Sequence, residues 1–145
     1  WGNQEATDEV FNDDGWFRSG DLGYIEDGFV YIVDRVKDLV IRGGENISCI
    51  EVEAAIYAHP SVQEAAVFGI PEERLGETLC TSICLKPSSS LTEDEIKDFL
   101  QDKIAEYKIP SMIKIHLEEL PRVASGKFSK KQLRDDFVAI EQHNS

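Results

Sequence analysis

Residues 34–53 read DRVKDLVIRGGENISCIEVE and contain the strongest structural signals in the chain. Five mostly charged residues precede the apolar run Leu39–Ile41, which gives way to the pair Gly43–Gly44. Two adjacent glycines permit backbone angles closed to other residues and let a ligand approach the main chain. Ser48 and Glu51 have the spacing of a capping box, which predicts that a helix begins there. The stretch is therefore typical of a joint followed by a loop that faces a ligand.

The composition indicates a globular chain rather than a nucleic-acid-binding or membrane protein. Of its 145 residues, 41% are hydrophobic and 30% are charged, which suits one domain with a core of modest size. The net charge of −13 disfavours nucleic acid and anionic membranes as partners. No apolar run approaches the ~20 residues of a membrane span, and the sequence opens without Met or a signal peptide. We therefore expect a piece of a longer protein.

The three cysteines, Cys49, Cys80 and Cys84, favour a reducing compartment. Cys80 and Cys84 fall on one predicted strand, roughly 13 Å apart at the usual rise per residue, which is too far for a disulfide. No cluster of Cys and His has the spacing of metal ligands. We expect buried free thiols in a cytoplasmic protein and predict no metal site.

Hydrophobic periodicity predicts an α+β fold, with a small antiparallel three-stranded sheet packed with helices. The sheet strands are expected at residues 62–70, 77–86 and 112–117. Capping residues predict helices that begin after Ser48, Thr92 and Ser129. Asp27–Gly28 is a favoured two-residue turn, so residues 23–33 are predicted to form a separate β-hairpin near the joint.

Three motifs resemble those of the adenylate-forming (AMP-binding) superfamily, which contains acyl-CoA synthetases, luciferases and peptide-synthetase adenylation domains. Residues 34–53 fit the hinge and glycine-loop motif of that superfamily. Phe17–Asp21 (FRSGD) fits a second motif of the same superfamily. The third is Pro121–Lys127 (PRVASGK), which departs from the family pattern only at Val123, where Thr or Asn is usual. In the first motif the matching positions are Asp34, Arg35, Lys37, Asp38, Val40, Gly44, Asn46, Ile47, Glu51, Val52 and Glu53.

The resemblance implies a role for each motif. Asp21 would accept hydrogen bonds from both ribose hydroxyls of the adenylate, and Arg35 would reach the ribose or the phosphates. Lys37 would occupy the hinge position. Lys127 would be catalytic, because an ammonium group between the substrate carboxylate and the α-phosphate of ATP lowers their repulsion. The loop Gly43–Glu45 (Gly43, Gly44 and Glu45) would line the tunnel for the CoA thiol.

The local charge supports a phosphate-binding role for the C-terminal part of the chain. Residues 107–134 contain seven basic and two acidic side chains, although the whole chain is strongly acidic. Such a patch suits the phosphates of a nucleotide or CoA. For Lys130 and Lys131, a solvated helix face remains an alternative interpretation.

The resemblance implies an ATP-dependent acid–thiol ligase as the parent protein. A carboxylic acid and ATP, with Mg²⁺ held mainly by ATP and an N-terminal domain, would give an acyl-adenylate and pyrophosphate. CoA would then form the thioester and release AMP. The family's phosphate loop and acyl pocket are missing from these residues, so we expect a mobile lid that is inactive alone and works with its own N-terminal domain. The expected divisions are 1–33 (end of the preceding domain, with ribose motif and hairpin), 34–38 (hinge), 39–140 (mobile C-terminal domain) and 141–145 (disordered tail).

Two other functions remain open at this point. The chain could come from an adenylation domain that loads a carrier protein, or it could be a non-catalytic module that binds a nucleotide or CoA. The form of residues 43–47, GGENI, favours acyl-CoA synthetases over peptide-synthetase domains. Within that group, the chain as a whole most resembles fatty-acid or medium-chain acid–CoA ligases. Ile41 stands where luciferases and plant coumarate ligases carry Lys, which makes those branches a poorer match.

Overall fold

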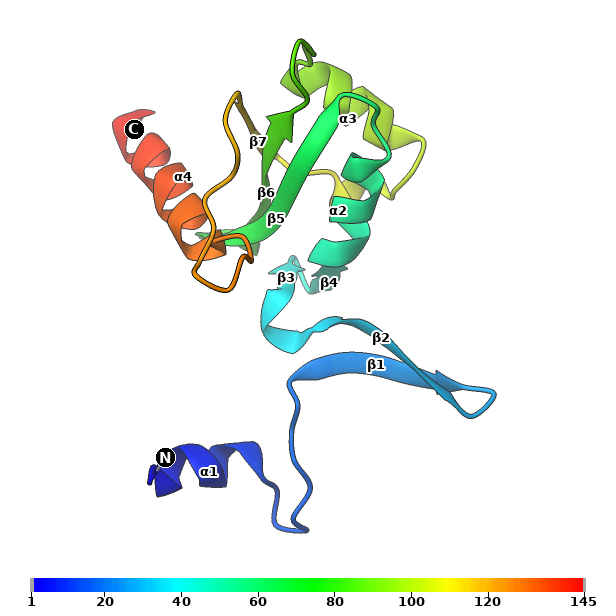
Figure 1. Cartoon of the computed structure of the whole chain (residues 1–145), viewed down its shortest axis with the longest axis vertical. Helices are drawn as coiled ribbons and strands as arrows, with labels where there is room; N and C mark the ends of the chain where they lie inside the picture. Colours follow the sequence, from blue (N-terminus) through cyan, green and yellow to red (C-terminus); the bar gives the residue numbers. More distant parts are fainter. Residues whose placement is uncertain (1, 145) are drawn as a thin grey trace. The chain divides into compact units, whose positions relative to one another are not determined.

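The computed structural model describes the backbone of residues 2–144 and the side chains of residues 2–139. The chain divides into two compact units, Trp1–Lys37 and Asp38–Ser145. Its elements follow one another from α1 at the N-terminus to α4 at the C-terminus (Figure 1). Each unit has its own internal strand pairing.

The first unit contains a short helix and a β-hairpin. Helix α1, Gln4–Val10, is capped by Asn3 and buries none of its residues, and this helix was not predicted. Strands β1, Asp21–Glu26, and β2, Phe29–Arg35, pair antiparallel around Asp27–Gly28. Both turn residues have positive φ, 50° and 82°, as a type I′ turn requires. The predicted hairpin is therefore confirmed.

The second unit is built on a mixed five-stranded sheet. The order is β4-β3-β6-β5, and β7 pairs with β6 beside β3. The strand bounds are β3 Leu39–Arg42, β4 Glu45–Ser48, β5 Val62–Glu72, β6 Gly76–Leu85 and β7 Met112–His116. The α+β class is confirmed, but the prediction of three strands is wrong because the segment before the two glycines and the segment after them both join the sheet.

Strand β7 runs parallel to β6, from Cys80↔Met112 to Cys84↔His116. The prediction of a wholly antiparallel sheet is therefore wrong. The reason lies in the connection, residues 86–111, which contains a helix and crosses one face of the sheet before the chain returns in the same direction. The tight β5–β6 connection gives the antiparallel pairing that was predicted.

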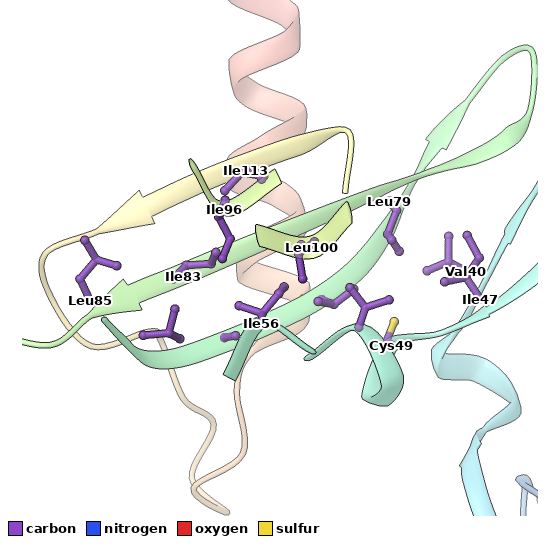
Figure 2. Close-up of a cluster of buried hydrophobic side chains, with 14 residues drawn as sticks. Val40, Ile47, Cys49, Ile56, Leu79, Ile83, Leu85, Ile96, Leu100 and Ile113 are labelled. Carbon is purple, nitrogen blue, oxygen red and sulfur yellow. The ribbon is translucent and has the colours of Figure 1, made fainter. Parts of the chain in front are cut away.

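Helices cover both faces of the sheet in the second unit. Helices α2, Cys49–Tyr57, and α3, Glu93–Gln101, pack on one face, and α4, Lys130–Asn144, packs on the other (Figure 1). The larger core lies under α2 and α3, where residues such as Ile56, Ile83 and Leu100 meet (Figure 2). The core under α4 includes Phe68 and Phe137, whose rings meet edge to face at 5.3 Å.

Local capping signals explain where two of these helices begin. The side chain of Ser48 accepts a hydrogen bond from Glu51 N–H at 3.3 Å. Thr92 and Glu95 form a complete capping box at the start of α3, as predicted. The backbone of α4 is helical through Asn144, where a disordered tail was predicted from residue 141, and Ser145 lies outside the described residues. No Gly or Pro interrupts this stretch.

The outer edge of β5 is occupied by side chains rather than by another strand. Glu53 Oε1 accepts a hydrogen bond from Val67 N–H at 2.9 Å. Arg134 Nε donates to the carbonyl oxygen of Gly69 at 3.0 Å. Residues of α2 and α4 thus bond backbone groups that the last strand of the sheet would otherwise present to solvent.

Cys49, Cys80 and Cys84 are all buried, as predicted, and none of the three forms a disulfide. In the described part of the chain, no helix combines the length and the apolar character needed to cross a bilayer.

Candidate functional site

The two residues predicted to bind the nucleotide lie side by side in the first unit. Asp21 and Arg35 are direct partners across the open end of the β1–β2 hairpin. Arg35 Nε lies 3.5 Å from Asp21 Oδ1, and more than a third of each side chain is exposed. Asp21 N–H donates to Ser19 Oγ at 3.1 Å, which fixes the backbone here. The pair presents a carboxylate acceptor beside a guanidinium donor, a combination that suits a ribose next to a phosphate.

The boundary between the two compact units falls between Lys37 and Asp38. Both residues belong to the single 3-10 turn Val36–Asp38, which connects β2 to β3. Lys37 was predicted from the sequence to be the hinge residue, so the division of contacts coincides with the predicted position.

Gly43 and Gly44 form the two-residue turn between β3 and β4, which we call the glycine turn. Their φ values are 59° and 90°, so both adopt backbone conformations that L side chains rarely take. Gly43 N–H donates to the carbonyl oxygen of Leu75 at 2.8 Å, and Glu45 pairs with Arg42 at the base of the turn. The predicted loop is therefore the hydrogen-bonded tip of a hairpin that belongs to the sheet.

Glu77, which was not predicted as a site residue, holds the strand that leads into the glycine turn. Its Oε2 accepts a hydrogen bond from Ile41 N–H at 2.7 Å. The preceding residue, Gly76, pairs with Arg42 at the only point where β3 joins β6 in the described register. A Gly-Glu pair at the start of a strand was the sequence signal available for this contact.

A surface groove of about 700 Å³ opens beside the glycine turn. Arg42 and Gly43 contribute to one side, and Lys97 and Gln101 of α3 contribute to another. Arg42 Nη1 donates to the carbonyl oxygen of Tyr107 at 3.2 Å, which ties the glycine turn to the 3-10 turn Glu106–Lys108. Two cationic side chains in the lining could contact phosphate groups of a ligand.

Residues 120–129 form a further, shorter hairpin, which we call the lysine loop. Arg122 and Phe128 make an isolated antiparallel bridge. Val123 N–H donates to the carbonyl oxygen of Lys127 at 2.9 Å, and Gly126 N–H donates to that of Val123 at 2.8 Å. Gly126 has a φ of +83°, the conformation that commonly closes a three-residue hairpin loop. The glycine before Lys127 is thus explained by the backbone.

The base of the lysine loop is bonded to Glu64 on β5. Glu64 as a whole residue is 7% exposed. Its Oε2 accepts from Leu120 N–H at 2.8 Å, and its Oε1 accepts from Arg122 Nη2. Arg122 Nη1 donates in turn to the carbonyl oxygen of Gly126 at 2.7 Å. Sequence reasoning missed Glu64, although one charged residue in the apolar run EAAVFGI was a visible signal.

Fewer basic side chains of residues 107–134 are unpaired than the sequence predicted, because acidic residues outside this range form ion pairs with most of them. The ion pairs are Lys108–Glu51, Lys114–Asp136, Arg122–Glu64 and Lys130–Glu53. The hydrogen bond from Lys108 to Glu51 is the main reason that the pKa of Lys108 lies above its usual range. In contrast, Lys127 is exposed and forms no hydrogen bond or ion pair with the side chains described for residues 2–139.

The glycine turn and the lysine loop are associated with different faces of the sheet. The groove beside the glycine turn is lined by α3, which packs on the face that also holds α2. Leu120 and Phe128 of the lysine loop pack with the cluster under α4. Within the described residues, no group of three or more His, Cys, Asp or Glu side chains is placed to hold a metal ion.

Residues 51–127, more than half of the chain, match the family described as AMP-binding enzyme C-terminal domain. The chain belongs to this family. The match to the AMP-binding C-terminal domain begins at Glu51 and ends at Lys127, so it includes Glu64 and most of the lysine loop. The glycine turn and the Asp21–Arg35 pair lie before it.

Relatives extend the similarity over almost the whole chain. The mitochondrial medium-chain acyl-CoA ligase ACSF2 of Rattus norvegicus is 44% identical over 99% of this chain and 23% of its own length. The long-chain-fatty-acid–CoA ligase FadD13 of Mycobacterium tuberculosis is 41% identical over 96% of this chain and 27% of its own. ATP-bound MatB from Rhodopseudomonas palustris matches with a TM-score of 0.85 and 36% identity, over 94% of this chain and 27% of MatB. This AMP-binding C-terminal domain chain thus spans about a quarter of the relatives it matches.

Proposed function

We propose that the chain is the lid of an AMP-forming acyl-CoA ligase. The observation that carries the proposal is Lys127, an exposed cation without a described partner at the tip of a hairpin whose base is firmly bonded. Two relatives named as acyl-CoA ligases, which match nearly all of the chain, support this reaction class. The complete active site would also need residues from the rest of the parent protein.

In the first step, a carboxylate oxygen of the acid attacks the α-phosphorus of ATP. The bond from that phosphorus to the bridging oxygen breaks, and pyrophosphate leaves. The Lys127 ammonium would lie between the two reacting anions and stabilise the negative charge that gathers there. Asp21 and Arg35 would hold the ribose and phosphate side of the nucleotide. Mg²⁺ would travel with the ATP phosphates and be held mainly by the N-terminal domain.

In the second step, the CoA thiolate attacks the acyl carbon of the adenylate, and AMP leaves with the oxygen of the broken bond. The glycine turn would line the path of the thiol, because it lacks side chains that could obstruct a narrow tunnel. Glu45 follows the turn directly. The groove beside Gly43, with Arg42 and Lys97 in its lining, would accommodate part of the polar CoA molecule.

A movement about Lys37 would bring these two sites to the substrates in turn. The association of the lysine loop and the glycine turn with different faces of the sheet supports this proposal, because one orientation would present only one of them. The unit boundary after Lys37 supports the location of the movement. A few backbone angles in a short connection are sufficient for such a rotation.

The test uses the parent enzyme that contains this chain. Pyrophosphate release is measured with ATP and a panel of carboxylic acids, for the wild type, Lys127→Ala and the control Lys131→Ala. Lys131 is an exposed cation at the start of α4 and carries no proposed role. We expect Lys127→Ala to slow adenylation roughly 10²- to 10³-fold, while thioester formation from supplied acyl-adenylate stays near the wild-type rate. Unchanged adenylation would leave the chain a binding or docking module.

The same assay separates the remaining alternatives. If a phosphopantetheinyl carrier protein replaces CoA as the better acceptor, the parent is a carrier-loading enzyme. The acid that reacts best defines the preferred acyl-chain length of the substrate. The names of the two relatives differ on this point, since one is named for medium-chain and the other for long-chain substrates. We propose a cytoplasmic location, and fractionation of cells tests it against the mitochondrial location in the name of the rat relative.

A further inference from the structure

Glu64 is a nearly buried carboxylate to which neither step of the proposed reaction gives a role. It lies at the start of β5, after an irregularity in the pairing with β6 between Val62 and Glu64. Its side chain is only 10% exposed, while that of its partner Arg122 is 41% exposed. Burying a carboxylate is costly unless it is paired and hydrogen-bonded, so this position is expected to have a specific purpose.

The hydrogen bonds of the Glu64 carboxylate both lead to the lysine loop. One oxygen accepts from Leu120 N–H, at the first residue of the loop, and the other accepts from Arg122. The same guanidinium donates to the carbonyl oxygen of Gly126, which is part of the peptide group that joins Gly126 to Lys127. One planar group therefore connects a carboxylate on the sheet to the backbone next to the lysine. The Phe128 ring, 4.4 Å from Arg122 Cζ, supports that group from another side.

We propose that Glu64 is a positioning residue for the adenylation step, acting through Arg122 to fix the direction in which Lys127 leaves the loop. The role rests on the proposed function of Lys127. A lysine side chain has a long flexible stem, so its ammonium reaches one place reproducibly only if the backbone at its base is fixed. A displacement of about 1 Å is enough to slow a reaction about 10²-fold.

The geometry requires arginine at position 122. Two different nitrogens of Arg122 reach Glu64 and Gly126, in a rigid fork. A lysine would keep the charge but would concentrate its donors on one atom, so it could not span both acceptors in the same way. Arg122→Lys is therefore expected to retain the ion pair and lose the connection to Gly126.

A second ion pair provides a matched comparison. At the far end of the loop, Lys130 Nζ lies 3.0 Å from Glu53 Oε1, and Glu53 also accepts from Val67 N–H. This pair fastens the start of α4 but makes no described contact with Gly126 or Lys127. Glu53→Gln removes a half-buried carboxylate of similar surroundings, so it should affect stability without selectively affecting adenylation.

The experiment compares Glu64→Gln and Arg122→Lys with Glu53→Gln and the exposed Glu118→Gln in the parent enzyme. We expect the first two to lower kcat for adenylation roughly 10- to 100-fold with little change in KM for ATP. Thioester formation from supplied acyl-adenylate should stay near the wild-type rate. Hydrogen exchange of a peptide covering residues 120–129 should become faster in these two variants, and it should stay unchanged in Glu118→Gln.

The outcomes distinguish this inference from the proposed function. Wild-type adenylation in Glu64→Gln or Arg122→Lys would overturn the positioning role, and so would unchanged exchange in the lysine loop. Equal losses in both half-reactions would also overturn it, because they indicate a general structural effect. If Glu64→Gln fails to fold, Arg122→Lys decides alone. If Lys127→Ala itself leaves adenylation unchanged, the proposed function fails, and the exchange data still report whether Glu64 holds the loop.

Discussion

The glycine turn and the lysine loop are both hairpins with a glycine at positive φ, but they are fixed by different interactions. Gly44 has a φ of 90° and Gly126 has a φ of 83°. The glycine turn continues a ladder of four residue pairs between β3 and β4. The lysine loop has one isolated bridge, at Arg122 and Phe128, and depends on the Arg122–Glu64 ion pair. The glycine turn is thus held mainly by the backbone ladder of the sheet, whereas the lysine loop has only a few backbone hydrogen bonds and adds an ion pair to β5.

This difference shows which mutations each hairpin tolerates. A backbone ladder survives the loss of any single side chain, because its hydrogen bonds come from the main chain. A loop held by a partly buried ion pair loses its anchor when Arg122 is removed, because the nearly buried Glu64 carboxylate is left uncompensated. The lysine loop is therefore the more sensitive of the two to changes at a distance in the sequence.

Among the tests of this comparison, the largest effect should come from valine in place of Gly44 or of Gly126, each as a single substitution. A Cβ at Gly44 or Gly126 would meet no described atom within 4 Å, so valine acts through backbone strain alone. We expect Gly126→Val to slow adenylation roughly 10- to 100-fold and Gly44→Val to slow thioester formation by a similar factor. The two half-reactions are assayed separately in the parent enzyme.

Gly28→Val is the control for this pair. Gly28 has a φ of +82°, also with open space at its Cβ, and lies in the turn between β1 and β2. Gly28→Val should introduce the same backbone strain but leave the rates of both half-reactions nearly unchanged. If Gly44→Val and Gly126→Val slow the same step, the assignment of one hairpin to each step is wrong.

A smaller effect is expected at Asp21, which should act on both steps rather than one. Asp21→Asn removes a charged acceptor and its contact with Arg35. We expect KM to rise about tenfold for ATP in the first step and for acyl-adenylate in the second, the equivalent of about 1.4 kcal/mol. Asp27→Asn makes the same charge change in the same hairpin and should leave KM unchanged. A change confined to one step would contradict a ribose contact.

The ion pair beside the groove should contribute modestly to stability. Lys108 Nζ lies 2.6 Å from Glu51 Oε1 and joins the 3-10 turn at Tyr107 to α2. Because the Glu51 side chain is 47% exposed, we expect Lys108→Met to lower the free energy of unfolding by only about 0.5–1 kcal/mol. A double-mutant cycle with Glu51→Gln in urea measures the coupling. Purely additive losses would show that the pair contributes no stability.

The smallest expected effect is a loss of folding stability when the pH is lowered. His116 on β7 is half-buried, with Nε2 3.2 Å from Ser82 Oγ. Burial, followed by the charge of Lys114, lowers the pKa of His116, and Asp136 partly opposes this. The unfolded chain therefore binds the proton more tightly, and stability falls as the pH drops below about 6.5, the ordinary value.

The urea midpoint at pH 7 and pH 5 tests this sign, for the wild type and His116→Gln. The variant should lose less stability between the two pH values than the wild type does. Carboxylates titrate in the same range in both proteins, so only the difference between them reports on His116. An identical pH dependence in the two proteins would show that His116 does not contribute.

Much of the local structure could be predicted because its causes are adjacent in the sequence. The Asp27–Gly28 turn and the Thr92–Glu95 capping box each depend on residues no more than three positions apart. The direction of β7 could not be predicted in this way, because it depends on whether the connection, residues 86–111, brings the chain back to the other end of the sheet before β7 begins. Helix α1 was missed because it buries no residue and therefore has no apolar stripe.

The sequence predicted the residues of the candidate site but not the carboxylates that hold them in place. Asp21 and Arg35 were selected separately and proved to be cross-strand partners. The carboxylates that hold the two hairpins, Glu64 and Glu77, lie 58 and 36 residues from the groups they bond. Such pairs follow no local spacing rule. The extent of the basic patch was overestimated for the same reason, because the acidic residues that pair with its lysines and arginine lie on α2, β5 and α4.

The occupied outer edge of β5 has a consequence for self-association. Unpaired edge strands can template the addition of a strand from another molecule and so lead to aggregation. Here Val67 N–H and the Gly69 carbonyl are already bonded to side chains, and the Tyr57 hydroxyl donates to the Ala65 carbonyl at 3.4 Å. A second chain would have to displace all three contacts before it could add a strand. These contacts thereby protect the β5 edge of the second unit from adding a strand of another molecule.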